Sequence, residues 1–214
     1  MRIGIIGAGN IGGALAKRFV ELGHDVSVAN SRGPDTLREL EKETGASAVT
    51  VRDAARGKDV VVVTIPEKNV PQLPKDLFDG VGGEVALIDT GNYYPQRDGR
   101  IDGIERGTAE SVWVSQQLGR PVIKAFNNIR ALHLRDNGRP QGSPGRIALP
   151  VAGDDPAAKS VVMGLVDDLG FDAVDAGSLE ESWRQQPGTP VYTADLDAEG
   201  VRRALAQAGP ERSA

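Results

Sequence analysis

The chain has 214 residues, enough for a full hydrophobic core in one large domain or in one domain with a small lobe. Its 25 basic and 30 acidic residues give a net charge of −5, which is ordinary and argues against a nucleic-acid partner. It contains no cysteine, which excludes disulfides, thiolate catalysis and cysteine-based metal sites, and we expect no metal.

The beginning of the chain and its longest apolar run bear on its location. The first expected strand begins at residue 2, which leaves no room for a signal peptide. The longest apolar run, residues 60–65, is of strand length and too short to cross a bilayer. We therefore expect a cytoplasmic protein with no membrane partner.

The N-terminal strand leads directly into a glycine-rich turn. Gly7, Gly9 and Gly12 form a G-x-G-x-x-G pattern between the apolar residues 1–6 and a helix over 14–20. In dinucleotide-binding proteins the first glycine permits the turn, the second lets the phosphates approach, and the third allows close helix–strand packing. The pyrophosphate then faces the free N–H groups of the helix. This context favours a dinucleotide site over a purely structural glycine turn.

The end of the second strand, residues 25–29, indicates which dinucleotide is bound. Proteins for NAD usually carry an acidic residue here to hold the ribose 2′-hydroxyl, whereas this chain has Asn30, Ser31 and Arg32, with no carboxylate before Asp35. One charge-assisted hydrogen bond to a 2′-phosphate contributes roughly 1.5–3 kcal/mol. The sequence therefore predicts NADP(H) rather than NAD(H). The alternative is a solvated arginine in a loop.

Strand and helix patterns alternate along the rest of the chain, which predicts a parallel sheet covered by helices. Up to residue 126 the expected elements are a helix near 36–44, a strand near 48–51, a helical turn at 53–56, a strand at 59–64, a helix opened by Pro66, a strand at 85–89, a helix at 109–118 and a strand at 121–126. Beyond it they are a short helix around His133, a strand at 147–152, a helix at 156–169, a strand at 173–175, a short helix at 179–185 and a helix at 198–208. We predict an α/β fold: a Rossmann-type doubly wound parallel sheet with helices on both faces in residues 1–126. Residues 127–214 would form a small C-terminal α/β lobe that packs on it and closes the acceptor pocket.

The expected strand ends offer few acids and bases. Ligands of doubly wound sheets lie beyond the carboxyl ends of the strands, where this chain has Thr64, Ile65, Pro66, Asn92, Ala125, Phe126, Asn127 and Asn128. These small, apolar and amide groups suit a nicotinamide. We expect His24 to be a surface residue at the wrong edge of the sheet and Lys124 to be structural. His133 is the one candidate for a catalytic role, although a plain helix-face histidine is the preferred interpretation.

This scarcity favours one kind of hydride acceptor. Reducing a carbonyl calls for a positioned proton donor, whereas a flavin-like ring spreads the charge and mainly needs alignment. A Tyr-x-x-x-Lys pair is missing, because Tyr93 and Tyr94 are followed at that spacing by Arg97 and Asp98. With Trp183 and Tyr192, the two tyrosines favour a stacked ring acceptor; scattered loop aromatics are the equal alternative.

Together these residues resemble the F420-dependent NADP oxidoreductase family, whose nucleotide domain is shared with the STEAP-type ferric reductases. The motifs that carry the resemblance lie at residues 7–12, 22–26, 30–32, 64–66, 124–127, 152–155, 161–163 and 175–179. The resemblance implies NADP contacts at Ala8, Gly9, Asn10, Ile11, Ser31, Arg32, Ile65, Asn69, Asn92 and Ala125. It also implies a deazaflavin ring lying against the nicotinamide. Residues 92–106 and 183–192 depart from the archaeal reductases, and both segments concern the identity of the acceptor.

The predictions combine into one site and one function. The predicted cofactor-binding residues are Gly7, Ala8, Gly9, Asn10, Ile11, Asn30, Ser31, Arg32, Thr64, Ile65, Pro66, Asn69, Asn92, Ala125 and Asn127. We expect an oxidoreductase that passes a hydride between NADPH and a flavin-like small-molecule acceptor, with coenzyme F420 as the first candidate. Alternatives are a reductase of another conjugated molecule or free flavin, and an NADP(H)-binding sensor without turnover. The short chain also suggests a homodimer, since a neighbour could close the acceptor pocket.

Overall fold

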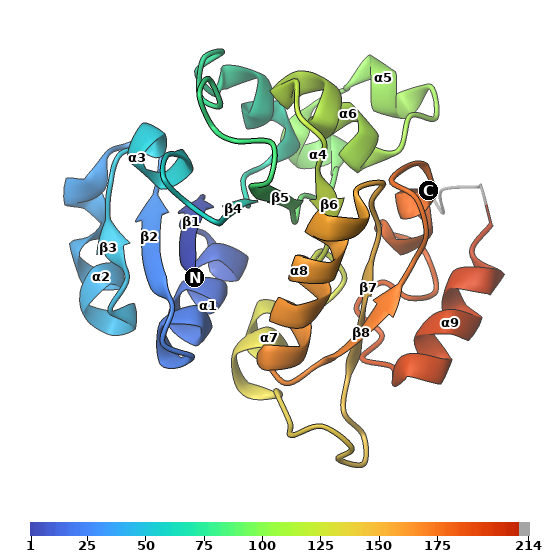
Figure 1. Ribbon diagram of the computed structural model, residues 1–214. Helices are drawn as coiled ribbons and strands as arrows, with labels where there is room; N and C mark the ends of the chain where they lie inside the picture. Colours follow the sequence, from blue (N-terminus) through green and yellow to red (C-terminus); the bar gives the residue numbers. More distant parts are fainter. Residues whose placement is uncertain (210–214) are drawn as a thin grey trace.

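Six parallel strands form the main sheet of the computed structural model, which describes residues 1–209 (Figure 1). They are β1 (Arg2–Ile6), β2 (Asp25–Ala29), β3 (Ser47–Ala48), β4 (Val60–Val63), β5 (Ala86–Asp89) and β6 (Ile123–Lys124). Their order across the sheet is β3-β2-β1-β4-β5-β6. The chain changes direction across the sheet between β1 and β4, which makes their carboxyl ends the switch point at which such sheets bind ligands. The predicted Rossmann-type fold is confirmed.

Helices cover both faces of this sheet. The helices of residues 1–209 are α1 (Asn10–Glu21), α2 (Arg38–Thr44), α3 (Val51–Ala55), α4 (Pro95–Asp98), α5 (Asp102–Glu105), α6 (Glu110–Leu118), α7 (Ala131–Asp136), α8 (Pro156–Asp168) and α9 (Ala198–Gln207), with 3₁₀ segments η1 (Pro34–Leu37), η2 (Glu67–Gln72) and η3 (Glu180–Gln185). Successive strand residues point to opposite faces, so Ile3 and Ile5 pack in one apolar cluster with α1 and α8, and Ile6 and Val61 in another with α3. This two-sided burial explains why β4 consists of four valines.

The C-terminal strands β7 (Ala148–Val151) and β8 (Asp172–Asp175) form a separate parallel pair. A single antiparallel bridge, Lys124 to Ala152, joins this pair to β6. Figure 1 shows α8 lying between the main sheet and the β7–β8 pair, with α9 beyond it. Leu149 and Val151 of β7 belong to the same apolar cluster as α1 and β1. The predicted boundary between residues 126 and 127 stays a prediction.

Several element boundaries differ from those expected. β3 ends at Ala48 instead of continuing to residue 51, because Thr50 caps α3 by accepting a hydrogen bond from the N–H of Asp53 (3.2 Å). β6 is two residues long instead of six, and Phe126, just beyond it, has φ = 62°. The segment after β5, for which no element was predicted, contains the short helices α4 and α5.

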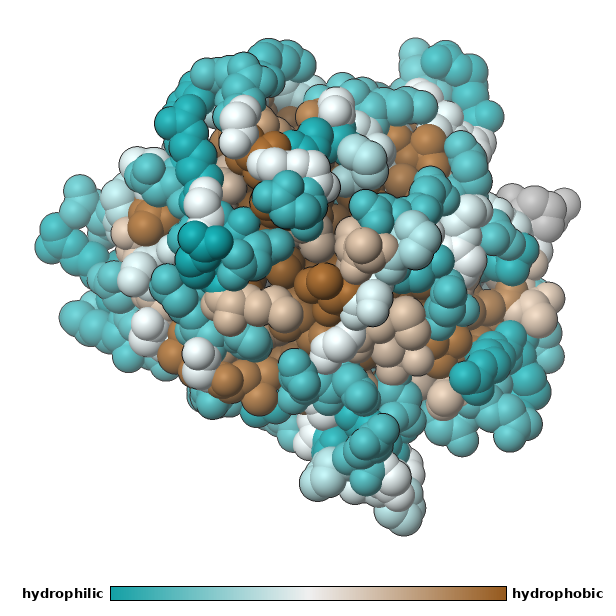
Figure 2. Space-filling model, viewed as in Figure 1, coloured by the Kyte–Doolittle hydropathy of each residue, from teal (hydrophilic) through white to brown (hydrophobic). Residues whose placement is uncertain are grey.

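Within residues 1–209, no helix is both long enough and apolar enough to cross a membrane. Figure 2 shows hydrophilic atoms over the margins of the molecule, with apolar atoms gathered across the middle of this face, around α8. Met1, Leu22 and Leu132 are large apolar side chains that remain exposed. Single exposed apolar residues of this kind are normal for a folded protein surface.

Candidate functional site

A groove of about 460 Å³ lies at the carboxyl ends of β1, β2 and β4. Its lining residues are Ile6, Gly7, Ala8, Gly9, Asn30, Ser31, Arg32, Val51, Thr64, Ile65, Pro66, Asn69, Gln72 and Leu73. The fold thus brings together most of the predicted cofactor-binding residues at the switch point. Four lining residues were not predicted, because nothing in their local pattern separates a groove wall from an ordinary strand, helix or turn: Ile6, Val51, Gln72 and Leu73.

The three glycines of the turn have the separate roles that the motif requires. Gly7 has φ = 123°, and a Cβ there would lie 2.1 Å from the carbonyl oxygen of Thr64. A Cβ on Gly12 would lie 2.0 Å from the carbonyl oxygen of Gly7, so α1 could not approach the strand as closely. A Cβ on Gly9 would meet no atom within 4 Å, because it would point into open space. The backbone at Gly9 is therefore accessible to a ligand at the start of α1.

The end of β2 presents Ser31 and Arg32 as exposed side chains. Asn30 shapes this turn: its Oδ1 accepts a hydrogen bond from the backbone N–H of Arg32 (2.9 Å), and its Nδ2 donates to Thr36 Oγ1 (2.9 Å). Among the described residues that line the groove, Arg32 is the only charged one, and its guanidinium forms no ion pair within residues 1–209. This geometry suits an anionic group at the end of β2.

The remaining predicted cofactor residues do not line the groove. Asn10 faces a neighbouring hollow between α1, α2 and α7, and Ile11 is half-buried against the core. Ala125 is completely buried. Asn92 and Asn127 bond to each other, the Asn127 Nδ2 donating to Asn92 Oδ1 (3.1 Å) and the Asn92 Nδ2 donating to the Asn127 carbonyl (2.9 Å).

Residues 185–195, which we call the closing loop, cover the carboxyl end of β6. Asn127 Nδ2 donates to the Gln185 carbonyl (2.7 Å), and Gln185 Nε2 donates to Asn127 Oδ1 (2.9 Å). The N–H of Thr193 donates to the Asn128 carbonyl (2.8 Å). Phe126 is fully buried with a left-handed backbone conformation, which is costly for a bulky residue and is found mainly where function requires it. The expected acceptor end of the site is thus both strained and covered.

The four loop aromatics, for which a stacked acceptor and a scattered arrangement were equal alternatives, lie in different places. The hydroxyl groups of Tyr94 and Tyr192 contact each other, and burial followed by this contact raises the pKa of Tyr192. Tyr93 is buried, with its hydroxyl group donating to Glu105 (2.7 Å). Trp183 lines a different hollow beside α5 and α6. Tyr94 and Tyr192 are therefore the one pair among these four aromatics whose hydroxyl groups meet.

Neither histidine lines the groove. His133, on α7, contacts the carboxylate of Asp195 in the closing loop. This contact holds the loop against α7, and a catalytic role for His133 stays a prediction. His24 is half-buried, with its ring edge-on to Phe19 at a centroid distance of 5.8 Å.

A buried ion pair lies beneath the ends of β5 and β6. Lys124 Nζ is 3.3 Å from Asp89 Oδ2 and donates to the Gly91 carbonyl (2.5 Å), and both side chains of the pair are almost completely buried. Ser111 Oγ also donates to Asp89 Oδ2 (2.6 Å). Lys124 is thus part of a buried ion pair, and its partner, 35 residues away, could not be identified from the sequence.

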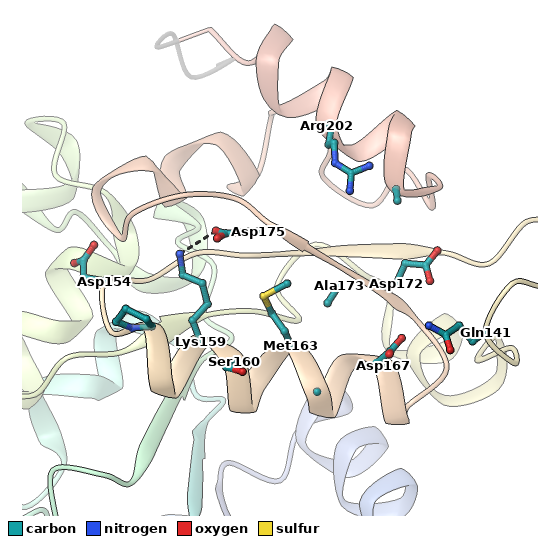
Figure 3. Close-up of a pocket in the computed structure, with 13 residues that line it drawn as sticks. Gln141, Asp154, Lys159, Ser160, Met163, Asp167, Asp172, Ala173, Asp175 and Arg202 are labelled. Carbon is teal, nitrogen blue, oxygen red and sulfur yellow. Dashed lines mark hydrogen bonds and ion pairs between the residues drawn. The ribbon is translucent and has the colours of Figure 1, made fainter.

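A larger hollow, of about 810 Å³, lies between α8, β8 and α9 (Figure 3). Figure 3 shows Lys159 extending from α8 to Asp175, with an Nζ–Oδ1 distance of 2.9 Å. The N-terminus of α8 is already capped by Asp155, whose carboxylate accepts from the N–H groups of Ala157 and Ala158. The smaller groove at the switch point is the better cofactor site because its helix N-terminus and its arginine are both available.

The fold and the groove define a dinucleotide-binding protein of the Rossmann type, and comparisons with known proteins identify its family. Residues 2–93 match the family described as NADP oxidoreductase, coenzyme F420-dependent. A solved hypothetical protein from Sinorhizobium meliloti is 33% identical over 92% of this chain and 95% of its own, with a TM-score of 0.75. The chain belongs to the family of coenzyme F420-dependent NADP oxidoreductases. The expected relation to the STEAP ferric reductases stays a prediction.

Two further similarities add to this picture. The protein YjhV of Escherichia coli (strain K12) is 54% identical over 96 residues, which are 44% of this chain and 63% of YjhV. The chain thus spans less than two thirds of the length of the curated relatives it matches. A structure from Arthrobacter sp. FB24, named as a candidate F420-dependent NADP-reductase, is 23% identical over 86% of this chain and 87% of its own, with a TM-score of 0.70. That similarity supports the fold.

Proposed function

We propose that the protein is an NADP(H)-dependent oxidoreductase that transfers a hydride between NADPH and a flavin-like acceptor, with coenzyme F420 as the first candidate. The observation that carries the proposal is Arg32, the single charged side chain among the described residues of the groove, next to Ser31 and the glycine turn. Family membership supports the same cofactor and the same acceptor.

The residues of the groove fit NADP(H) in a defined orientation. The N-terminal N–H groups of α1, next to Gly9, would hold the pyrophosphate. Ser31 and Arg32 would bind the 2′-phosphate, and the apolar side chains of Val51 and Leu73 would pack against the adenine. The cofactor supplies the hydride when it is bound. Its nicotinamide would lie over Ile65, toward the ends of β5 and β6.

The residues at the acceptor end favour a conjugated ring. Amides and aromatic hydroxyl groups predominate there, from Asn92, Asn127, Tyr94 and Tyr192, and they can orient a ring without supplying strong acid–base chemistry. Asn127 would become free to contact an acceptor if its two hydrogen bonds to Gln185 in the closing loop opened.

The test of cofactor choice is the Arg32→Ala variant. Loss of one charge-assisted contact to the 2′-phosphate should weaken NADPH binding by roughly 10- to 100-fold and leave NADH binding nearly unchanged. Arg106→Ala, at an exposed arginine outside the groove, is the matched control and should bind both cofactors as the wild type does. Equal losses of NADPH and NADH affinity in Arg32→Ala would refute the assignment.

A second candidate is an NADP(H)-binding sensor without turnover, which the covered end of β6 favours. Mixing the protein with NADPH and either coenzyme F420 or FMN, and following absorbance at the nicotinamide band, distinguishes the two. Oxidation with one of these acceptors supports the reductase. Tight NADPH binding without oxidation across acceptors supports the sensor.

We also propose a homodimer, in which a neighbour completes the acceptor pocket; light scattering that shows a monomer would contradict it.

A further inference from the structure

Glu67 is a buried carboxyl group for which the proposed hydride transfer has no use. It is the first residue of η2 and follows directly on Ile65 and Pro66, which line the groove. Its side chain is completely buried, and neither of its oxygens has a hydrogen-bond partner among the described residues. A Cβ on Gly91 would lie 2.3 Å from Glu67 Oε1, so the carboxyl group lies against the turn that follows β5.

The surroundings of Glu67 are unfavourable for a carboxylate. Asp89 of β5, Glu110 of α6 and Asp98 of α4 are the acidic groups that face it, and Lys124 of β6 is the nearby cation. Lys124 is already engaged by Asp89 and by the Gly91 carbonyl. Burial, and then the charge of Asp89, raise the pKa of Glu67 well above its ordinary value, and Lys124 only partly opposes this. Its surroundings therefore favour the protonated form of Glu67 over the carboxylate more strongly than water does.

The same acidic neighbours affect the pKa of Lys124. Burial by itself would lower the pKa of Lys124, but the neighbouring carboxyl groups of Asp89, Glu110 and Glu67 raise it above its ordinary value. Lys124 thus stays an ammonium group that is matched to the Asp89 carboxylate. Among the acidic side chains of this cluster, Glu67 is the one whose two oxygens both lack a hydrogen-bond partner among the described residues.

Such a change of charge accompanies the oxidation state of the cofactor. NADP⁺ carries a positive charge on its nicotinamide ring, and NADPH does not. Under the proposed function the ring would lie over Ile65, two residues before Glu67, toward the ends of β5 and β6. Electrostatic interactions weaken less with distance in a partly buried site than in water, so the ring charge would favour the ionised form of this carboxyl.

We propose that Glu67 holds a proton when the groove is empty or contains NADPH, and releases it to solvent when NADP⁺ binds. This inference rests on the proposed function. The step involves only proton dissociation from the Glu67 carboxyl; no bond to the cofactor forms or breaks, and no electron moves. Glu67 is thus a positioning residue that balances the ring charge, and through it pH sets the preference of the site between the two cofactor forms.

Infrared spectroscopy of the cofactor-free protein tests the first half. The wild type at pH 7 should show the carbonyl band of a buried protonated carboxylic acid, and Glu67→Gln should lack it. Glu67→Met, of similar length, removes the same proton without adding an unpaired amide, so it serves if the glutamine variant does not fold. Glu84→Gln, at an exposed glutamate just before β5, is the matched control and should retain the band. The absence of a Glu67-dependent acid band would overturn the proposal.

Calorimetric titration with NADP⁺ and NADPH, in buffers of different ionisation enthalpy, tests the second half. The 2′-phosphate is common to both forms, so its protonation cancels in the difference. The wild type should release up to about one more proton with NADP⁺ than with NADPH, so NADP⁺ affinity should rise by up to roughly tenfold per pH unit relative to NADPH. In Glu67→Gln this difference should disappear.

Equal proton release for the two cofactor forms in the wild type would refute the linkage while leaving the proposed cofactor intact. Failure of both forms to bind would refute the proposed function and the linkage with it, and the infrared band would still report whether Glu67 is protonated. The two failures are therefore distinguishable.

Discussion

Three glycine-to-alanine variants at the start of α1 test the cofactor site, because the structure predicts a different result for each. Gly9 has φ = −80° and ψ = −166°, which alanine tolerates, and its added Cβ would meet no atom within 4 Å. Gly9→Ala should therefore be as stable as the wild type, or up to about 1 kcal/mol more stable through the unfolded state. Its methyl group would instead occupy space that the pyrophosphate needs.

The other two variants separate binding from packing. Gly12→Ala places a Cβ 2.0 Å from the Gly7 carbonyl oxygen, so α1 must shift, at a cost of about 1–3 kcal/mol. Gly13→Ala makes only an ordinary 3.6 Å contact with Leu40 and should stabilise α1 by about 0.5–1 kcal/mol, with unchanged binding.

The assay combines urea unfolding with calorimetric titration of NADPH. Displacing the phosphate from one N–H group of α1 costs the equivalent of a charge-assisted hydrogen bond. Gly9→Ala should therefore bind NADPH roughly 10- to 100-fold more weakly, although its free energy of unfolding is not lowered. If Gly9→Ala binds NADPH within twofold of the Gly13→Ala control, the pyrophosphate does not lie at this turn and the reasoning is wrong.

Three further predictions concern the buried cluster and the closing loop. Lys124→Met leaves the Asp89 carboxylate buried without its cation and should cost about 3–5 kcal/mol in urea unfolding; a loss below 1 kcal/mol would contradict the burial of the pair. Because the pKa of Glu67 is raised, the folded protein keeps a proton that the unfolded chain loses. Stability should therefore fall as the pH rises above the ordinary titration range of a glutamate, and Glu67→Gln should flatten that slope; equal slopes would contradict it. Asn127→Ala removes both side-chain bonds to Gln185, so amide exchange in the closing loop should become faster, and an unchanged rate would show that other contacts hold it.

The sequence was sufficient for the sheet and the phosphate end of the site, because both depend on local patterns. The alternation of apolar strands with helices predicted all six strands of the main sheet. The order of glycines in the first turn predicted which of them would be packed and which open, and the structure confirms this for Gly7, Gly9 and Gly12. The absence of a carboxylate at the end of β2 likewise needs no tertiary information to be recognised.

The acceptor end could not be predicted in the same way, because it is built by residues far apart in the chain. Asn127 was expected to face a ligand, but Gln185, 58 residues away, occupies its amide. Glu67 follows Pro66 at the start of a helix, where a charged side chain is usually exposed. Its burial becomes visible only in the structure, which places it against Gly91 and near Lys124. A charged residue in a sequence does not reveal the partner that allows its burial.

The most direct test of the account is a crystal structure of the protein with NADP⁺. We predict that the 2′-phosphate contacts Ser31 and Arg32, that the pyrophosphate lies at the first turn of α1 beside Gly9, and that the nicotinamide extends over Ile65. A cofactor bound in another hollow, or a 2′-phosphate directed into solvent away from Arg32, would contradict the central claim.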